Sequence, residues 1–197
     1  MNIRAPESLE PAETDQRSGR IPHGLFGMVI FVIAEIMFFA GMISAFLIIK
    51  AGSSIWPPLD QPRLPVEETA LNSLALLASG AFLFLAHRAF HRGDRSSMRR
   101  PMWIALALGS FFVLFQGVEW IALLQQGLTL TSSSLGSFFY LIVGVHALHA
   151  VAALILLGVA SLRLSRGWLP PGLFGAAEAL WFFVVGVWPV LYLVVYL

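Results

Sequence analysis

A long apolar run near the beginning of the chain most constrains its fold. Residues 24–50 read GLFGMVIFVIAEIMFFAGMISAFLIIK, and only Glu35 and Ser44 interrupt the apolar residues before Lys50. At about 1.5 Å rise per residue, a helix of this length crosses a bilayer core of about 30 Å. Four further apolar runs of spanning length cover residues 70–90, 101–124, 135–162 and 173–197. None alternates with a period of two, so the sequence predicts an all-α membrane protein, a bundle of five transmembrane helices.

The composition supports membrane insertion. Hydrophobic residues make up 58% of the chain and charged residues 12%, whereas soluble domains carry about 25% charged residues. Residues 1–22 contain four acids, three arginines and three prolines, without the apolar core of a secretory signal. We therefore divide the chain into a polar tail, 1–22, and a five-helix transmembrane domain, 23–197. The absence of cysteine excludes disulfides and thiolate-bound metal centres.

The basic residues predict the orientation of the bundle. With five crossings, ten of the twelve Lys and Arg residues fall on the side of the N-terminus, and only Lys50 and Arg63 fall on the other side. By the positive-inside rule, the N-terminus is cytoplasmic and the C-terminus lies outside. The expected location is a bacterial or archaeal-type inner (plasma) membrane. Aromatic residues near the predicted helix ends are interpreted as interfacial anchors: Trp103 and Trp168 on the inner side, and Trp56, Trp120, Trp188, Tyr192 and Tyr196 on the outer side.

Glu35 is the strongest functional clue in the sequence. It lies near the middle of the first predicted helix, where an ionised carboxylate costs roughly 3 kcal/mol or more. The carboxyl group is therefore either protonated or paired with another group inside the protein. A structural hydrogen bond and a role in proton handling or in organising lipid both remain open.

Two imidazoles lie near the centre of the fourth predicted helix. His146 and His149 are three residues apart and so face roughly the same way. One interpretation is a metal or haem site, since imidazole is the commonest metal ligand, but a closed site needs further ligands. Neutral imidazoles bonded to neighbouring helices are a second interpretation. A pairing with Glu35, which lies at a similar depth, is the third.

Other polar residues are expected to have structural roles. Glu119 lies near the outer end of the third predicted helix, and Gln116 is a candidate hydrogen-bond partner for it. The same role is expected for Glu178, one to two turns into the last helix. His87 and His91, one turn apart beside an arginine cluster, are interpreted as facing anionic lipid head groups rather than a metal.

Small residues four apart predict close approaches between helices. The pairs are Gly41 with Ala45, Ala105 with Gly109, and Gly175 with Ala179.

Motifs along the chain resemble the cytochrome c oxidase subunit III family. They are the segment GLFGMVIFVIAEIMFFAGMISAF at 24–46, WPP at 56–58, LN at 71–72 with LLASG at 76–80, FQGVEW at 115–120, GSFFYLIVGVHALH at 136–149 and WFFVVGVWPVLYLVVY at 181–196. Their order and spacing are similar to the short, five-helix form of the family.

The resemblance implies a non-catalytic subunit of a respiratory haem-copper terminal oxidase, which supports oxygen reduction coupled to proton translocation. The implied partners are the catalytic subunit I, subunit II and bound phospholipid, with no nucleic acid. Haem and copper are expected in the partner subunits, and no catalytic, cofactor-binding or metal-binding residue is expected in this chain.

The resemblance also assigns roles to individual positions. Glu35 matches the family's buried glutamate, which is associated with lipid and with oxygen access near the catalytic subunit. The positions with implied structural roles are Glu119, His146, His149, Asn72, Trp181 and Trp188.

One departure from the family pattern leaves alternatives open. The last helix of the family usually carries a His and an Asp where this chain has Phe182 and Val185, so apolar packing is expected to replace their contact. An accessory subunit of a nitric oxide reductase is one alternative. Separately from this departure, a small proton-coupled transporter, in which Glu35 loads and releases the proton, is the alternative from another class of protein.

Overall fold

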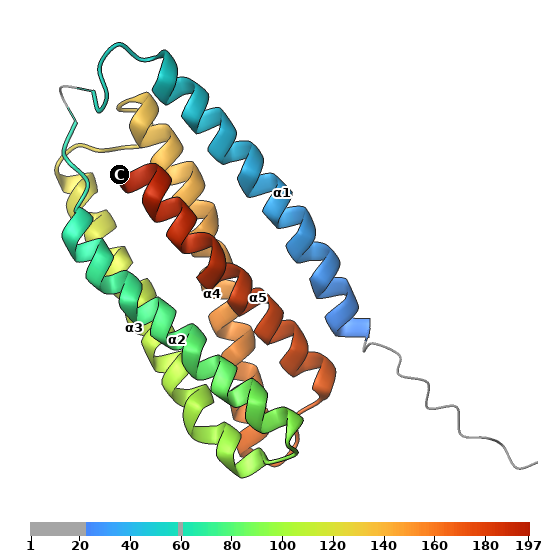
Figure 1. Cartoon of the computed structure of the whole chain (residues 1–197). Coiled ribbons are helices and arrows are strands. Elements are labelled where there is room, and N and C mark those ends of the chain that lie inside the picture. Colours follow the sequence, from blue (N-terminus) through green and yellow to red (C-terminus); the bar gives the residue numbers. More distant parts are fainter. Residues whose placement is uncertain (1–22, 59–60) are drawn as a thin grey trace, which may run out of the picture.

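The computed structural model describes residues 23–58 and 61–197, which form five long helices and a short π-helix (Figure 1). The elements are α1 (His23–Gly52), α2 (Val66–His91), α3 (Arg95–Gln125), α4 (Ser134–Ser165), α5 (Pro171–Leu191) and η1 (Tyr192–Tyr196). Each of the five α-helices is long and apolar enough to cross a membrane. The predicted all-α, five-helix fold is therefore confirmed. The predicted polar tail, 1–22, lies outside the described residues.

The helices run alternately up and down, so α1 begins at one end of the bundle and the chain finishes at the other (Figure 1). α2 and α3 form the closest pair, α5 contacts α1, α2 and α4, and α1 packs on α5 and α4 at one side. α1 is thus an edge helix, with its remaining surface facing away from the bundle. Which side of the membrane each end faces stays a prediction.

α3 begins six residues before the predicted start at Pro101, and the added turns are polar. The Asp94 carboxylate accepts hydrogen bonds from the backbone N–H groups of Ser96 and Ser97, both at 3.1 Å. These donors have no partner within the helix, so a capping carboxylate stabilises a start at Arg95. Pro101 is accommodated inside the helix. The predicted boundary was wrong because the apolar run alone defined it.

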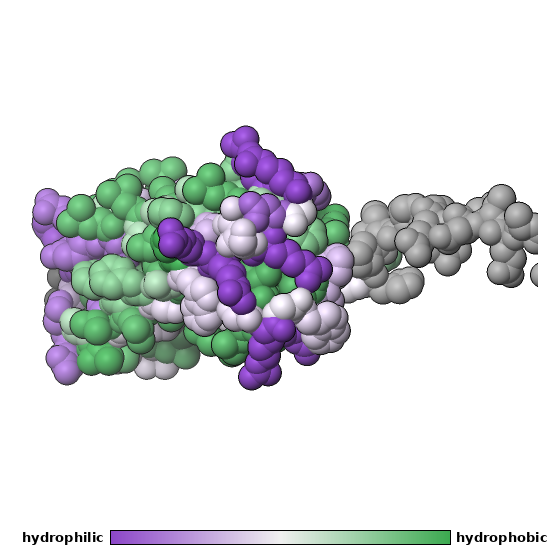
Figure 2. Space-filling model, turned by 90° about the horizontal axis from the view of Figure 1, so that it is seen from below, coloured by the Kyte–Doolittle hydropathy of each residue, from purple (hydrophilic) through white to green (hydrophobic). Residues whose placement is uncertain are grey.

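Arginines in these first turns tie α3 to the end of α4. Arg95 Nη1 donates to the carbonyl oxygen of Gly167 at 3.0 Å, and Arg99 Nη2 donates to that of Ser165 at 2.5 Å. The carbonyl of Ser165 is the last of α4 and has no intrahelical partner, and that of Gly167 lies just beyond the helix, so these cations satisfy both groups. We call this end of the bundle the basic end; it carries Arg88, Arg92, Arg95, Arg99, Arg100, Arg163 and Arg166. Figure 2 shows hydrophilic side chains gathered on the bundle seen from below, beside hydrophobic surface.

The other helix ends also extend beyond the apolar runs. α2 begins at Val66 rather than at residue 70, and Glu67 and Glu68 lie in its first turn, where negative charge is favourable. The last helix was expected to continue regularly to residue 197. Instead α5 contains Pro189, which has no backbone N–H to donate, and ends at Leu191, where η1 begins.

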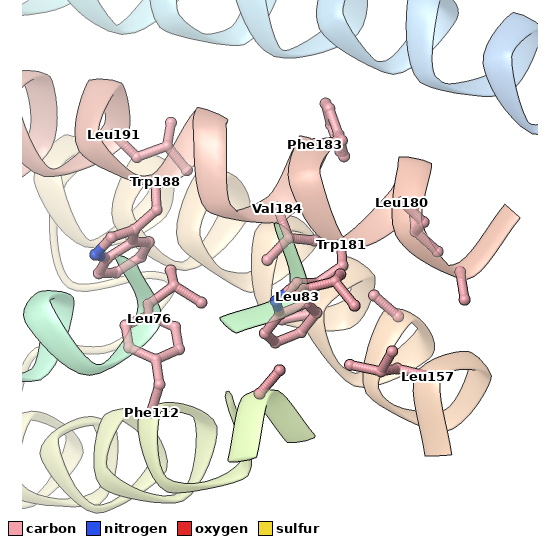
Figure 3. Packing of buried hydrophobic residues seen from close by; sticks show 14 of the residues in the cluster. Leu76, Leu83, Phe112, Leu157, Leu180, Trp181, Phe183, Val184, Trp188 and Leu191 are labelled. Atoms are coloured by element: carbon pink, nitrogen blue, oxygen red, sulfur yellow. The ribbon is translucent and has the colours of Figure 1, made fainter. Parts of the chain in front are cut away.

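Two tryptophans of α5 occupy the centre of the bundle (Figure 3). Trp181 Nε1 donates to Ser79 Oγ at 3.0 Å, and Trp188 Nε1 donates to Ser73 Oγ at 2.7 Å. Both serines belong to α2, so each indole fills the core and bonds a neighbouring helix. Phe183 lies on the opposite face of α5, toward α1. The anchor interpretation is wrong for Trp188 and for Tyr196, because both side chains are buried.

Small residues permit two of the three predicted close approaches. A Cβ atom on Gly109 would lie 2.5 Å from the Trp181 ring, and one on Gly175 would lie 3.2 Å from the side chain of Leu25. Gly41, by contrast, has no atom within 4 Å of the corresponding position among the described residues. The small-residue pattern therefore marks helix contacts on α3 and α5 and an outward face on α1.

Candidate functional site

The candidate functional site is a carboxyl–imidazole contact between α1 and α4. Oε2 of Glu35 lies 3.3 Å from Nε2 of His149, within ion-pair distance although not aligned as a hydrogen bond. The side chains of Glu35 and His149 are 18% and 12% exposed. The packing of α1 on α4 thus brings the two residues together at the edge of the bundle, as the third interpretation of the imidazoles requires.

The contact of His149 with the backbone of its own helix indicates which ring nitrogen carries a proton. Nδ1 of His149 lies 2.8 Å from the carbonyl oxygen of Val145. A carbonyl only accepts, so Nδ1 carries a proton. Nε2 then has only a lone pair, which would repel the lone pairs of an ionised Glu35 carboxylate unless a further proton lay between the two atoms. One proton between Nε2 and the carboxyl group would make the pair neutral overall, which is the charge state that a bilayer tolerates.

Aromatic rings enclose the imidazole. Phe31 stacks on His149 with centroids 5.9 Å apart, and Phe39 and Phe183 approach its edge at 5.9 and 5.8 Å. These rings come from α1 and α5, so three helices build the surroundings of one polar contact. They limit the access of water to the contact between Glu35 and His149.

His146 lies deeper than His149 and makes a different set of contacts. It is 1% exposed, stacks on Trp188 with centroids 5.2 Å apart and meets the edge of Phe39 at 6.2 Å. Neither of its ring nitrogens has a hydrogen-bond partner within the described part of the chain. Its role therefore differs from that of His149, although both lie on one face of α4.

No group of three or more His, Cys, Asp or Glu side chains that could hold a metal ion is found in residues 23–58 and 61–197. Glu35, His146 and His149 therefore do not form a set of three ligands around one point. The metal-site interpretation of the two imidazoles has no ligand set in this region.

A second buried polar cluster surrounds Glu119 at the end of the bundle opposite the basic end. Oε2 of Glu119 accepts from Thr69 Oγ1 at 3.0 Å and from Gln116 Nε2 at 2.8 Å. Gln116 Nε2 also donates to the hydroxyl oxygen of Tyr196 at 3.2 Å. The hydrogen bond to Gln116 expected from the sequence is present, and Thr69 and Tyr196 are partners that the sequence did not suggest. The cluster joins α2, α3 and η1.

A third polar contact was not foreseen. His87 Nδ1 lies 2.6 Å from Glu178 Oε1, joining α2 to α5 near the basic end. From the sequence, His87 is expected to lie with His91 at the lipid head groups, and Glu178 is expected to have a separate structural role. The depth of both residues, each one to two turns from the basic end of the bundle, is the signal that the sequence offers.

Asn72, Trp181 and Trp188, three of the positions with implied structural roles, bond neighbouring helices. Asn72 Nδ2 donates to the carbonyl oxygen of Phe112 at 3.1 Å, alongside the tryptophan–serine bonds already described. At the departure from the family pattern, Val185 packs on Gly80, where an added Cβ would come within 2.9 Å of its Cγ1. Apolar packing therefore occupies the position at which the family usually carries Asp.

Comparisons with known proteins converge on one family. The family model described as "Cytochrome c oxidase subunit III" matches residues 13–197. Cytochrome c oxidase subunit 3 of the cyanobacterium Synechocystis sp. is 32% identical over 195 residues, which cover 95% of this chain and 81% of that protein. The subunit 3 proteins of Sus scrofa and Tragelaphus imberbis are 34% and 33% identical over 180 residues, covering 87% of this chain and 68% of each relative.

Proposed function

The chain belongs to the cytochrome c oxidase subunit III family, and from this premise we propose that it supports the catalytic subunit of a respiratory haem-copper oxidase without holding a redox centre itself. As a subunit III it assembles with other oxidase subunits in a membrane that it crosses several times. In the proposal, subunits I and II hold the haem and copper, reduce oxygen and move protons. The membrane is the inner (plasma) membrane of a prokaryotic cell.

The observation that carries the proposal is the contact of Glu35 with His149 on an otherwise apolar edge helix. α1 contributes the most apolar of the five spans, yet only 17% of its most apolar window is buried, against 50% for the last span. A carboxyl group that is partly exposed at mid-membrane depth is costly against lipid tails alone. A neighbouring subunit packed on α1 would cover it, and we assign that place to the catalytic subunit.

A groove at the basic end supports the proposed phospholipid. It has a volume of about 440 Å³ and lies between α2 and α3. Its polar part carries Arg88, Arg92 and Arg100, and its apolar part includes Phe82 and Leu85. Arginines beside apolar side chains at a membrane surface fit an anionic head group with its acyl chain.

The alternatives are less well supported. The relatives described above are subunits of cytochrome c oxidase, which favours an oxidase over a nitric oxide reductase. A proton-coupled transporter would need Glu35 to exchange its proton with water, whereas the aromatic shell around His149 limits that access.

Photocrosslinking from two equally exposed positions tests the proposal. A photoreactive residue at Met37 on α1 and a matched control at Leu114 on α3, each 71% exposed, are introduced separately into the full chain expressed with its complex. We expect Met37 to crosslink to a haem-bearing polypeptide and Leu114 to react mainly with lipid. If neither position yields a crosslinked haem-bearing subunit, and none co-purifies, the proposed function is wrong. Crosslinking from Leu114 alone would move the interface to α3.

A further inference from the structure

Four buried polar atoms on α3 and α4 lack hydrogen-bond partners among the described residues. They are Gln116 Oε1, Trp120 Nε1 and both ring nitrogens of His146. Buried polar groups in proteins are almost always bonded to protein or to ordered water. Four such atoms on adjacent helices therefore indicate a missing polar neighbour.

The same three side chains line one cavity. It has a volume of about 140 Å³ and lies between α3 and α4, with Trp188 of α5 as a further wall. Gly117 and Ala147 leave the space open, and an added Cβ on Gly117 would have no atom within 4 Å among the described residues. A water molecule occupies about 30 Å³ in the liquid, so the space is sufficient for a few.

Most of the cavity wall is apolar, and its few polar groups suit water rather than an apolar occupant. The indole N–H of Trp120 donates and the amide oxygen of Gln116 accepts, while a neutral His146 supplies one donor and one acceptor. Water both donates and accepts, so a small cluster supplies the kinds of partner that these four atoms lack. A lipid chain would leave them unpaired at a cost in free energy.

We propose that the cavity lined by Gln116, Trp120, His146 and Trp188 is a binding site for a small cluster of ordered water molecules. Gln116 also bonds Glu119 and Tyr196 through its Nε2. The water cluster thereby extends the Glu119 network inward to His146. Water fixed in this way explains how an imidazole that is 1% exposed stays in the core without a protein partner.

X-ray radiolytic footprinting of the complex in lipid nanodiscs tests the site, because radicals formed from bound water oxidise the side chains beside it. Trp188 and Trp181 form a matched pair: both are buried on α5, and each donates to a serine of α2. Only Trp188 lines the cavity. We expect Trp188 and His146 to be oxidised several-fold faster than Trp181, with ¹⁸O incorporated from labelled water.

Two variants locate the water. Gly117→Leu places a side chain in the cavity and should lower the oxidation of Trp188 to the rate of Trp181. Gly186→Leu, at a position that also has open space among the described residues but does not line the cavity, should leave it unchanged. Equal, slow oxidation of Trp188 and Trp181 in the wild-type complex, which needs no variant, would overturn the proposal. So would an unchanged rate at Trp188 in Gly117→Leu.

Discussion

At the scale of single residues, the chain keeps polar groups in the membrane by pairing them between helices. Glu35 contacts His149 between α1 and α4, and Glu119 accepts two hydrogen bonds from α2 and α3. Each pairing removes the need for a charge to face lipid. The loss of stability on breaking such a pairing therefore depends on whether the substituted side chain can still donate a hydrogen bond.

Glu35→Gln and Glu35→Leu should separate these effects. The amide N–H of glutamine can donate to Nε2 of His149, so Glu35→Gln should retain the assembly and most of the oxygen reduction. Glu35→Leu leaves that nitrogen without a donor and should lower the stability of the complex by about 1–3 kcal/mol. Thermal unfolding in detergent measures the difference.

A double variant provides the control for this comparison. In a His149→Phe background, Glu35→Leu should cost little, since no nitrogen is left unpaired. Equal destabilisation by Gln and Leu at position 35 would show that the two residues do not share a proton.

The sequence could indicate which residues were important but not how they paired. Depth along a helix identified Glu35, His146 and His149, because an apolar run makes any polar residue conspicuous. Which imidazole meets Glu35 depends on how α1 and α4 are rotated about their axes, and the contact of His87 with Glu178 depends on the packing of α2 on α5. Neither rotation is encoded in spacing along one helix.

At the scale of elements, apolar runs predicted the spans but not their polar ends. The interior of each helix is specified by hydropathy, whereas the starts of α2 and α3 depend on Pro65, Asp94 and charged residues that the apolar pattern does not include. The π-turn after Pro189 is likewise a backbone feature that hydropathy cannot report.

The Asp94 cap makes the α2–α3 turn sensitive to acid. Hydrogen bonds from the hydroxyl groups of Ser96 and Ser97, and from their backbone N–H groups, lower the pKa of Asp94 from 3.8 to about 2. The pKa of Asp94 is lower in the folded state than in the unfolded state. The ionised cap therefore stabilises the folded state fully above about pH 3.8, and this stabilisation disappears as the pH falls toward 2.

Hydrogen exchange at the amides of Ser96 and Ser97 measures this effect. Protection relative to the intrinsic rate should fall between about pH 4 and pH 2 in the wild-type chain. Asp94→Asn should keep the cap without the pH dependence, and Asp94→Ala should lose protection at every pH. A fall in protection that persists in Asp94→Asn would show that another group is responsible.

The contact between α3 and α5 at Gly109 should tolerate no side chain. Gly109→Ala places a methyl group 2.5 Å from the Trp181 ring, which the bond to Ser79 holds in place. We expect a loss of about 1–3 kcal/mol in unfolding free energy, as for other overpacked cores. Gly41→Ala, which meets no atom within 4 Å among the described residues, is the matched control. Comparable stability of the two variants would contradict the packing described here.

At the scale of the whole molecule, the charge distribution predicts how the bundle is inserted. Of the basic residues in the described helices and loops, those of the basic end outnumber Lys50 and Arg63 at the other end. We therefore expect the basic end to face the cytoplasm.

Single cysteines introduced into this cysteine-free chain test the orientation. In intact cells, a membrane-impermeant maleimide should label Thr131→Cys, in the loop between α3 and α4, and should not label Arg166→Cys, after α4, until the membrane is permeabilised. Both native residues are exposed. The reverse labelling pattern would invert the proposed topology.

The central claim is that this chain assists a redox subunit and holds no redox centre. The most direct test measures the visible difference spectrum and the oxygen uptake of the complex before and after the chain is removed. We predict that the haem signals remain with the other subunits, that the separated chain carries none, and that most of the initial oxygen reduction survives its removal. Haem or copper retained by the separated chain, or immediate loss of oxygen reduction together with the haem signals, would contradict the account.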